Sequence, residues 1–390
     1  MTILDASQQD ADRQASRHDA DNHGAGQHGA DAETAFDSLL DHVRAEFDTT
    51  FTWDYERSRD GLNRLYEKAK RSQWNVSDDL DWSIDVDPYK TLAPADPLEV
   101  QYFAENPESP MHKFNEEEWA EVGVESMNWS LSQFMHGEQG ALLCTARLVE
   151  AVPWIDAKYY AATQVVDEAR HVEAFARYLD EKMPAIYPIN ENLKSLIDQV
   201  LRDERWDLVY LGMQVVIEGL ALAAFGLMLG TTQEPLLKAM LRYVMADEAR
   251  HVAFGILSLQ ELYEDMDAAE FRVRQEFAYE ACNMMRRRTL NSELWPSFGI
   301  SNAEIEALLP NQQSQQRMQH LLFSKIVPNC KKLGLLDLRD GWLRERFQEM
   351  GIIQYENWEN TAEALTIGDA VEPIHAGSVD SAGSAGPVTS

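Results

Sequence analysis

A five-residue motif occurs twice in the sequence, and each copy carries a carboxylate and an imidazole three positions apart. The motif Asp-Glu-Ala-Arg-His spans residues 167–171 and recurs at 247–251. Residues three apart share one face of a helix, so each glutamate and its histidine point toward the same place. Another glutamate lies 30 residues before each motif glutamate. The candidate metal ligands are therefore Glu138, Glu168, His171, Glu218, Glu248 and His251.

The spacing of these glutamates predicts two helical hairpins. Pro153 lies midway between the first two glutamates, and Gln233 lies midway between the second two. Each glutamate would then lie about 15 residues from a turn, or roughly 22 Å along its helix, beside its partner on the neighbouring helix. The stretch 182–204 is long enough to cross the bundle between the hairpins.

Four carboxylates and two imidazoles in an apolar core require compensating charge, because burying one unpaired carboxylate costs on the order of several kcal/mol. Two divalent cations would balance four glutamates. Oxygen and imidazole ligands without thiolate suit iron or manganese better than zinc. We therefore expect two iron ions per chain, and a Mn/Fe pair is the alternative. The alternative is a duplicated helix pair whose Glu, Arg and His residues form salt bridges.

In these residues the sequence resembles the ferritin-like di-iron carboxylate superfamily, and the Asp-Glu-x-Arg-His form is similar to that of hydroxylase subunits of bacterial multicomponent monooxygenases. The resemblance covers about residues 115–265. It implies one iron at Glu138, Glu168 and His171, the other at the second triad, and a bridging glutamate from each motif. It also implies that each motif's aspartate accepts a hydrogen bond from the imidazole of the opposite motif, and that the arginines balance the charge of the aspartates. The alternative role for these residues is a structural ion pair. They are Asp167, Arg170, Asp247 and Arg250.

The resemblance implies a di-iron oxygenase or oxidase that uses O2 and external electrons on a small, largely apolar organic substrate. A ribonucleotide reductase subunit would carry a tyrosine where this chain has Phe175, and an N-oxygenase would carry an additional histidine at Val244. A monooxygenase hydroxylase usually has a threonine at the position of Leu222. Hydroxylation, N-oxygenation, desaturation and C–C cleavage stay open. The alternative function is a ferroxidase or metal-binding scaffold without organic substrate.

Residues one turn from the ligands are candidates for the wall of a substrate pocket, with ordinary core packing as the alternative. Gln164 and Gln214 are polar side chains at core-facing positions, so they need hydrogen-bond partners. The candidate pocket residues are Phe134, Gln164, Phe175, Gln214, Leu222, Met245 and Gly255.

Apolar residues recur at spacings of three and four, which predicts an all-α fold, a ferritin-like four-helix bundle with a di-metal core and flanking helices. We expect one domain over 36–366, with the metal-binding bundle at about 115–265 and disordered tails at 1–35 and 367–390. The segment 74–88 is interpreted as a solvated acidic turn. The predicted helices are 36–48, 57–72, 115–150, 155–181, 204–229, 233–264, 267–290, 312–333 and 339–349.

The net charge of the chain argues against some classes of binding partner. With 66 acidic against 34 basic residues, the net charge is -32, which argues against nucleic acid and anionic membrane surfaces. The stretch 211–230 is apolar, but Glu218 lies near its centre, so we expect no membrane span. Three separated cysteines and no apolar N-terminal leader predict a cytoplasmic protein.

The sequence has no flavin or nicotinamide fingerprint, so a ferredoxin or reductase is expected as electron donor. Basic clusters at 286–288 and around Lys325, Lys331 and Lys332 are candidate docking sites for an acidic ferredoxin or acyl carrier protein bearing the substrate. Three arginines at a helix C-terminus that complement its dipole are the alternative explanation. A homodimer is expected.

Overall fold

The computed structural model describes residues 40–91, 97–288, 291–308 and 313–358. The chain divides into Met1–Arg44 and Ala45–Ser390, and the helices of the described residues belong to the second unit. The tails predicted to be disordered, 1–35 and 367–390, lie outside the described residues.

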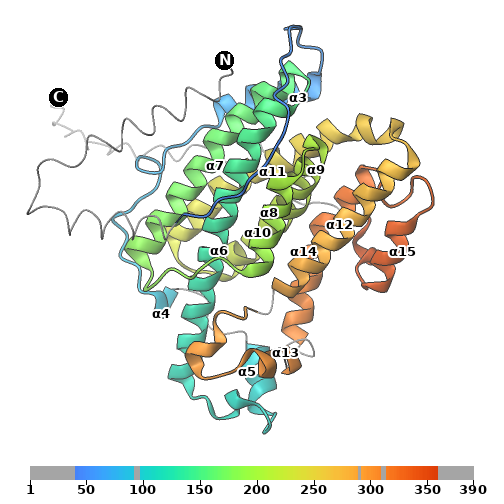
Figure 1. Cartoon of the computed structure of the whole chain (residues 1–390). Helices are drawn as coiled ribbons and strands as arrows, with labels where there is room; N and C mark the ends of the chain where they lie inside the picture. Colours follow the sequence, from blue (N-terminus) through green and yellow to red (C-terminus); the bar gives the residue numbers. More distant parts are fainter. Residues whose placement is uncertain (1–39, 92–96, 289–290, 309–312, 359–390) are drawn as a thin grey trace, which may run out of the picture. The chain divides into compact units, whose positions relative to one another are not determined.

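Every regular element among the described residues is helical, which confirms the all-α prediction (Figure 1). The short helices comprise the 3-10 helices η1, η3 and η5 and the π-helix η2. In chain order the elements are α3 (Asp60–Arg71), α4 (Pro88–Thr91), α5 (Pro97–Ala104), η1 (Pro110–Lys113), α6 (Glu116–Ala151), α7 (Ile155–Lys182), α8 (Glu191–Arg202), α9 (Trp206–Tyr210), η2 (Leu211–Ile217), α10 (Glu218–Thr231), α11 (Pro235–Asp265), α12 (Ala268–Arg288), η3 (Trp295–Phe298), α13 (Asn302–Leu308), α14 (Gln313–Lys332), α15 (Trp342–Glu349) and η5 (Ile353–Tyr355).

Two helical hairpins form the centre of this arrangement, and both predicted turns are present. Helices α6 and α7 are joined through Pro153, and α10 and α11 are joined by residues 232–234. Asn115 caps α6 by accepting hydrogen bonds from two backbone N–H groups, while Glu118 accepts one from the Asn115 N–H. Glu234 caps α11, ahead of Pro235 at its first position. Local capping chemistry therefore sets where these long helices begin.

Two sequence predictions of local structure need correction. The helix predicted at 36–48 is wrong over 40–48, where the described chain is irregular. A short isolated helix is marginal without tertiary packing, and the next residues instead follow the α6–α7 turn, where the Thr50 N–H donates to the Glu150 carbonyl. The prediction also lacked four helices: α8, which lies in the crossover at 182–204, and α4, α5 and α13.

The apolar stretch around Glu218 is a core helix. Residues Trp206–Thr231 are long and apolar enough to cross a membrane, with a mean hydropathy of 1.8, but 89% of that window is buried inside the protein. Its middle part is the π-helix η2, which ends at the residue before Glu218. A π-turn inside an α-helix is rare and occurs frequently at functional sites.

Gly212 allows η2 to pack closely against α8 and α12. A Cβ atom at this position would lie 2.4 Å from Val200 Cγ2 and 2.9 Å from Phe277 Cζ. We therefore expect Gly212→Ala to reduce the free energy of unfolding by about 1–3 kcal/mol, measured by chemical denaturation. Gly230→Ala is the matched control, because nothing lies within 4 Å of its Cβ position. Equal stability of the two variants would contradict this packing.

Candidate metal centre

The six candidate ligands meet in the core although they come from four helices. Glu138 lies on α6, Glu168 and His171 on α7, Glu218 at the start of α10, and the last two, Glu248 and His251, on α11. All six are buried, with Glu138 the most accessible at 5%. This is the ferritin-like arrangement: two of the four helices each direct one glutamate into the bundle, and the other two each direct a Glu-x-x-His pair.

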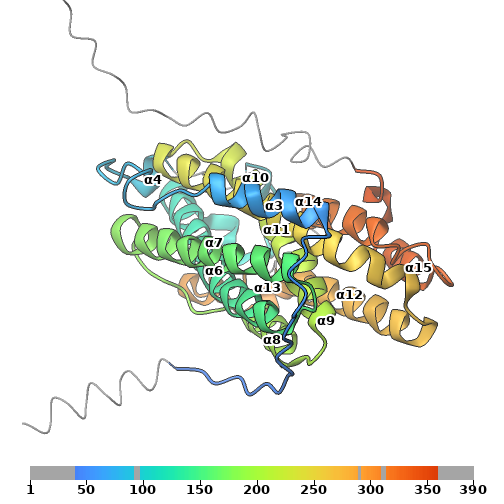
Figure 2. The same ribbon diagram turned by 90° about the horizontal axis from the view of Figure 1, so that it is seen from above.

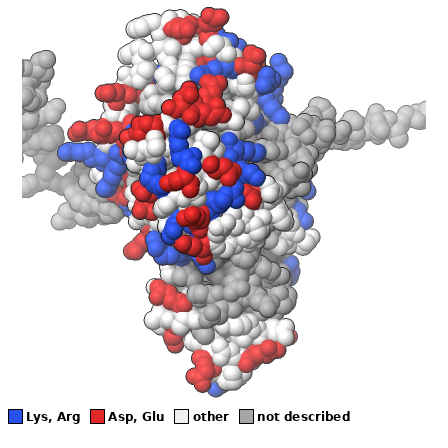
Figure 3. Space-filling view, turned by 90° about the vertical axis from the view of Figure 1, so that its right-hand side faces the viewer, with Lys and Arg blue, Asp and Glu red and all other residues white. Residues whose placement is uncertain are grey.

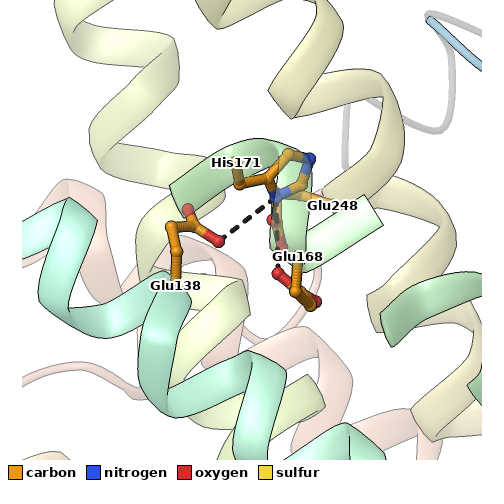
Figure 4. A group of neighbouring side chains, drawn as sticks. All are labelled: Glu138, Glu168, His171 and Glu248. Carbon is orange, nitrogen blue, oxygen red and sulfur yellow. Dashed lines mark hydrogen bonds and ion pairs between the residues drawn. The ribbon is translucent and has the colours of Figure 1, made fainter. Parts of the chain in front are cut away.

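The ligand atoms form two overlapping groups. One group contains Glu138, Glu168, His171 and Glu248, and the other contains Glu168, Glu218 and His251, with the ligand atoms of each group within 4.8 Å of one another. Figure 4 shows the first group around the His171 ring. His171 Nδ1 lies 3.2 Å from Glu138 Oε2 and 3.2 Å from Glu248 Oε1. Glu168 belongs to both groups, so its two oxygens can serve two ions.

Each imidazole contacts the aspartate of the opposite motif through its outer nitrogen. His171 Nε2 lies 3.2 Å from Asp247 Oδ2, and His251 Nε2 lies 3.3 Å from Asp167 Oδ2. A proton held on Nε2 by the aspartate leaves the Nδ1 lone pair directed at the glutamates. The aspartates therefore orient both rings for metal binding.

Two buried arginines join these aspartates into one network. Arg170 pairs with the aspartate of its own motif and lies 3.3 Å from Asp247, and Arg250 pairs with Asp247 and lies 3.5 Å from Asp167. Arg250 is among the largest fully buried side chains. The aspartates are thus compensated by guanidinium groups without the metal, whereas the only basic groups of the described residues that contact the glutamates are the two imidazoles.

Two residues of this network were missed by the sequence analysis. Trp74 Nε1 donates to Asp247 Oδ2 at 2.7 Å, and Gln73 Nε2 donates to Asp167 Oδ1 at 3.1 Å. Both residues directly follow α3. The interpretation of 74–88 as a solvated turn is wrong for Trp74, Val76 and Leu80, which are buried. No local motif indicates these contacts, because the partners lie 94 and 173 residues away in the chain.

The two core glutamines have different surroundings. Gln164 Nε2 donates to Glu168 Oε1 and to Glu218 Oε1, both at 2.9 Å, so it holds two candidate ligands together. Gln214 lies in the π-helix and donates to the Thr145 hydroxyl at 3.3 Å.

A cavity of about 30 Å³ lies beside the cluster, lined by Glu138, Glu218 and Glu248 among others. Of the candidate pocket residues it includes Phe134 but not Gln164, Phe175, Gln214, Leu222, Met245 or Gly255. Phe175 instead packs against Phe134 and Phe225 in the core. This volume is comparable to that of one water molecule in the liquid, so an organic substrate would need the lining side chains to move.

Burial and neighbouring charges shift the pKa values of Glu138, Glu168 and Glu218 in different directions. Burial and the charge of Glu248 raise the pKa of Glu138 well above its usual value, and burial, Glu248 and Glu168 do the same for Glu218. Burial opposes ionisation of Glu168 too, but the neighbouring histidines outweigh it and hold the pKa of Glu168 well below its usual range. In the protein without metal, Glu138 and Glu218 therefore keep their protons to higher pH than an exposed glutamate does.

The donor set fits two cations. Among the described residues, Glu168 Oε2, Glu218 Oε2, both oxygens of Glu248 and His251 Nδ1 are buried and make no hydrogen bond. A buried polar atom without a partner costs roughly 1–3 kcal/mol, and more if it is charged. These atoms all point into the two groups, and cations placed there would satisfy them.

Comparisons with known proteins find only weak similarity, and only to solved structures. No protein-family model matches the chain, and no curated protein matches it. Among solved structures, R2-like ligand-binding oxidase with aerobically reconstituted Mn/Fe cofactor is 20% identical, covering 72% of this chain and 94% of that chain, with a TM-score of 0.43. A tyrosine-to-phenylalanine variant of that oxidase is 18% identical with the same coverage and a TM-score of 0.46. With TM-scores below 0.5, the functional assignment rests on this chain's own side chains.

The protonated glutamates predict how the stability of the metal-free protein depends on pH. The pKa values of Glu138 and Glu218 are raised in the folded state, so folding binds protons and the free energy of unfolding falls as pH rises above about 4.5. Thermal unfolding of the metal-free protein between pH 5.5 and 8.5 should show this decline. Glu138→Gln with Glu218→Gln should make the decline shallower, because glutamine mimics the protonated acid, while the raised pKa of His171 and His251 leaves a residual decline of the same sign. The exposed substitution Glu349→Gln should leave the slope unchanged, and an equal slope in all three proteins would contradict the assignment.

Proposed function

We propose that this protein is a dimetal oxidoreductase that uses O2, with an Fe/Fe or Mn/Fe pair held by Glu138, Glu168, His171, Glu218, Glu248 and His251. The observation that supports this proposal most strongly is the shared glutamate: Glu168 belongs to both ligand groups, as a pair of ions with a common carboxylate requires. A single-ion site or a salt-bridge network has no need for such sharing. Buried carboxylate oxygens without a hydrogen bond also weigh against a pure salt-bridge network, whose polar atoms would be satisfied without metal.

The protein residues would contribute binding, orientation and exclusion of water. When bound, the metal pair would supply the electrons that reduce O2. The aspartates hold both imidazoles with Nδ1 inward, and Gln164 fixes the near oxygens of two glutamates. The cavity beside Glu138 is large enough for a molecule of the size of O2 and is lined mainly by apolar side chains. These features favour a dry site whose ligands need little rearrangement.

We further propose that the reaction oxidises a small, largely apolar organic molecule, with electrons from a ferredoxin or reductase. The support is chemical: the cavity is bordered by Phe134, Ile217 and Met285, and a monooxygenase turnover consumes two external electrons. The small size of this cavity favours the second candidate, a ferroxidase that oxidises iron without organic substrate. Hydroxylation, N-oxygenation and desaturation all remain compatible with the site.

Metal analysis of ligand variants tests the shared glutamate. After anaerobic loading with Fe(II), or with Mn(II) and Fe(II), we expect about two metal ions per chain in the wild-type protein. Glu168→Ala should lose most of both ions, whereas Glu218→Ala should retain about one, because Glu218 belongs to one group only. Glu173→Ala, an exposed glutamate on the same helix, is the control. Full loading of a correctly folded Glu168→Ala variant would overturn the assignment.

Oxygen consumption separates the two candidate functions. A ferroxidase consumes O2 in proportion to added Fe(II) and then stops. An oxidase or oxygenase continues to consume O2 at constant metal content when a reductant and an organic substrate are supplied. Uptake that never exceeds the amount of added iron, with every substrate class offered, would favour the ferroxidase.

A further inference from the structure

Helix α3 carries a concentration of positive charge that is unusual for this chain. Residues 57–71 contain six lysines and arginines and only two acids, in a protein whose net charge is -32. An acidic partner is repelled by most of such a surface, so a local cationic patch decides where it can approach.

Part of this charge has no acidic counterpart. Glu67 pairs with Lys70 at 2.9 Å and with Arg57 at 3.4 Å, and Arg59 pairs with Glu261. Within the described part of the chain, Arg64, Lys68 and Arg71 have no carboxylate partner. Burial and the nearby Arg250 lower the pKa of Lys68, as expected where cations gather without anions.

The face that carries α12 and α15 provides a contrast. Figure 3 shows acidic and basic side chains intermingled on that side of the molecule. Its arginines are neutralised locally: Arg272 pairs with Asp340, and Arg344 lies 2.6 Å from Asp337 and 2.7 Å from Glu356. The charge of this face is therefore less available to a partner than that of α3.

The surface around α3 is also hollowed. An open groove of about 750 Å³ runs along the helix, and its lining comprises Arg57, Asp60, Asn63, Arg64, Glu67, Lys68 and Arg71. A second hollow of about 340 Å³ lies between α3 and α7, where Tyr66, Tyr159 and Val166 contribute apolar surface, with Val166 50% exposed. A charged rim beside an apolar floor with two tyrosines has the composition of a protein-binding surface.

This surface lies directly over the metal centre. Helix α3 packs across α7 and α11, the helices that carry both Glu-x-x-His motifs (Figure 2). Gln73 lines the second hollow and donates to Asp167, which in turn contacts His251 Nε2. Two side chains thus separate the floor of the hollow from a candidate metal ligand.

We propose that α3 and the adjoining exposed stripe of α7 form the docking surface for a small acidic electron-donor protein of the ferredoxin class. The proposal rests on the proposed function, because only a redox centre needs such a donor. The rate of electron transfer between proteins falls steeply with distance, so the donor should dock where few side chains separate the protein surface from the metal centre. Two donor molecules, each oxidised by one electron, would deliver the two electrons that one turnover consumes.

A binding measurement tests the surface without any metal. Isothermal titration of the full-length metal-free protein with an acidic [2Fe–2S] ferredoxin should show binding that weakens with added salt. The variant Arg64→Gln, Lys68→Gln, Arg71→Gln should bind about tenfold more weakly. Its control is Lys113→Gln, Arg202→Gln, Arg287→Gln, which removes the same charge at exposed positions elsewhere, including the 286–288 cluster. Equal weakening in both variants, or no binding by the wild-type protein, would overturn the proposal.

Reduction kinetics separate docking from the metal centre itself. In anaerobic stopped-flow experiments on the metal-loaded oxidised proteins, the α3 variant should be reduced about tenfold more slowly by the ferredoxin, but at the wild-type rate by dithionite. Unchanged reduction by ferredoxin would show that the donor docks elsewhere. Failure of the proposed function would instead appear as absent metal in the wild-type protein, with the ferredoxin titration unaffected.

Discussion

The burial of four glutamates between two helical hairpins is the constraint on which the rest of this structure depends. Two aspartates share the same core, but Arg170 and Arg250 already balance them. Among the described residues no lysine or arginine pairs with the glutamates, whose only basic contacts are the two imidazoles, and several of the glutamate oxygens have no hydrogen bond. In the metal-free protein burial and mutual repulsion raise the pKa of Glu138 and Glu218, whereas two divalent cations would neutralise all four acids.

The surrounding elements hold this core at fixed geometry. Short turns after α6 and α10 keep the glutamates of each hairpin at one level, and the π-helix η2 leads directly into Glu218. Gly255 permits close contact of α11 with this π-helix, since a Cβ there would lie 2.8 Å from the Gln214 Cβ. The outer aspartates then orient both imidazoles, so the ligands are positioned through rigid helices rather than loops.

The duplicated motif does not produce a symmetric site. Both motif glutamates lie between the two rings, but at unequal distances: Glu168 is 3.4 Å from His171 Nδ1 and 3.1 Å from His251 Nδ1, whereas Glu248 is 3.2 Å and 3.6 Å from the same atoms. The indole of Trp74 contacts one aspartate, and the amide of Gln73 contacts the other. The small cavity lies beside Glu138, Glu218 and Glu248, away from these contacts. The two metal positions therefore have different surroundings, which suits two ions that perform different tasks.

The sequence by itself determined the four long helices of the bundle, both turns and the identities of the six residues that meet in the core, but not helices α4, α5, α8 and α13. These features follow from local periodicity, from turn residues and from the regular spacing of a repeat, all of which are readable along the chain. Only the tertiary structure decided that residues 40–48 form no helix, and that Gln73 and Trp74 complete the network. Those outcomes depend on contacts between residues far apart in the chain, where packing overrides local preference and leaves no pattern in the sequence.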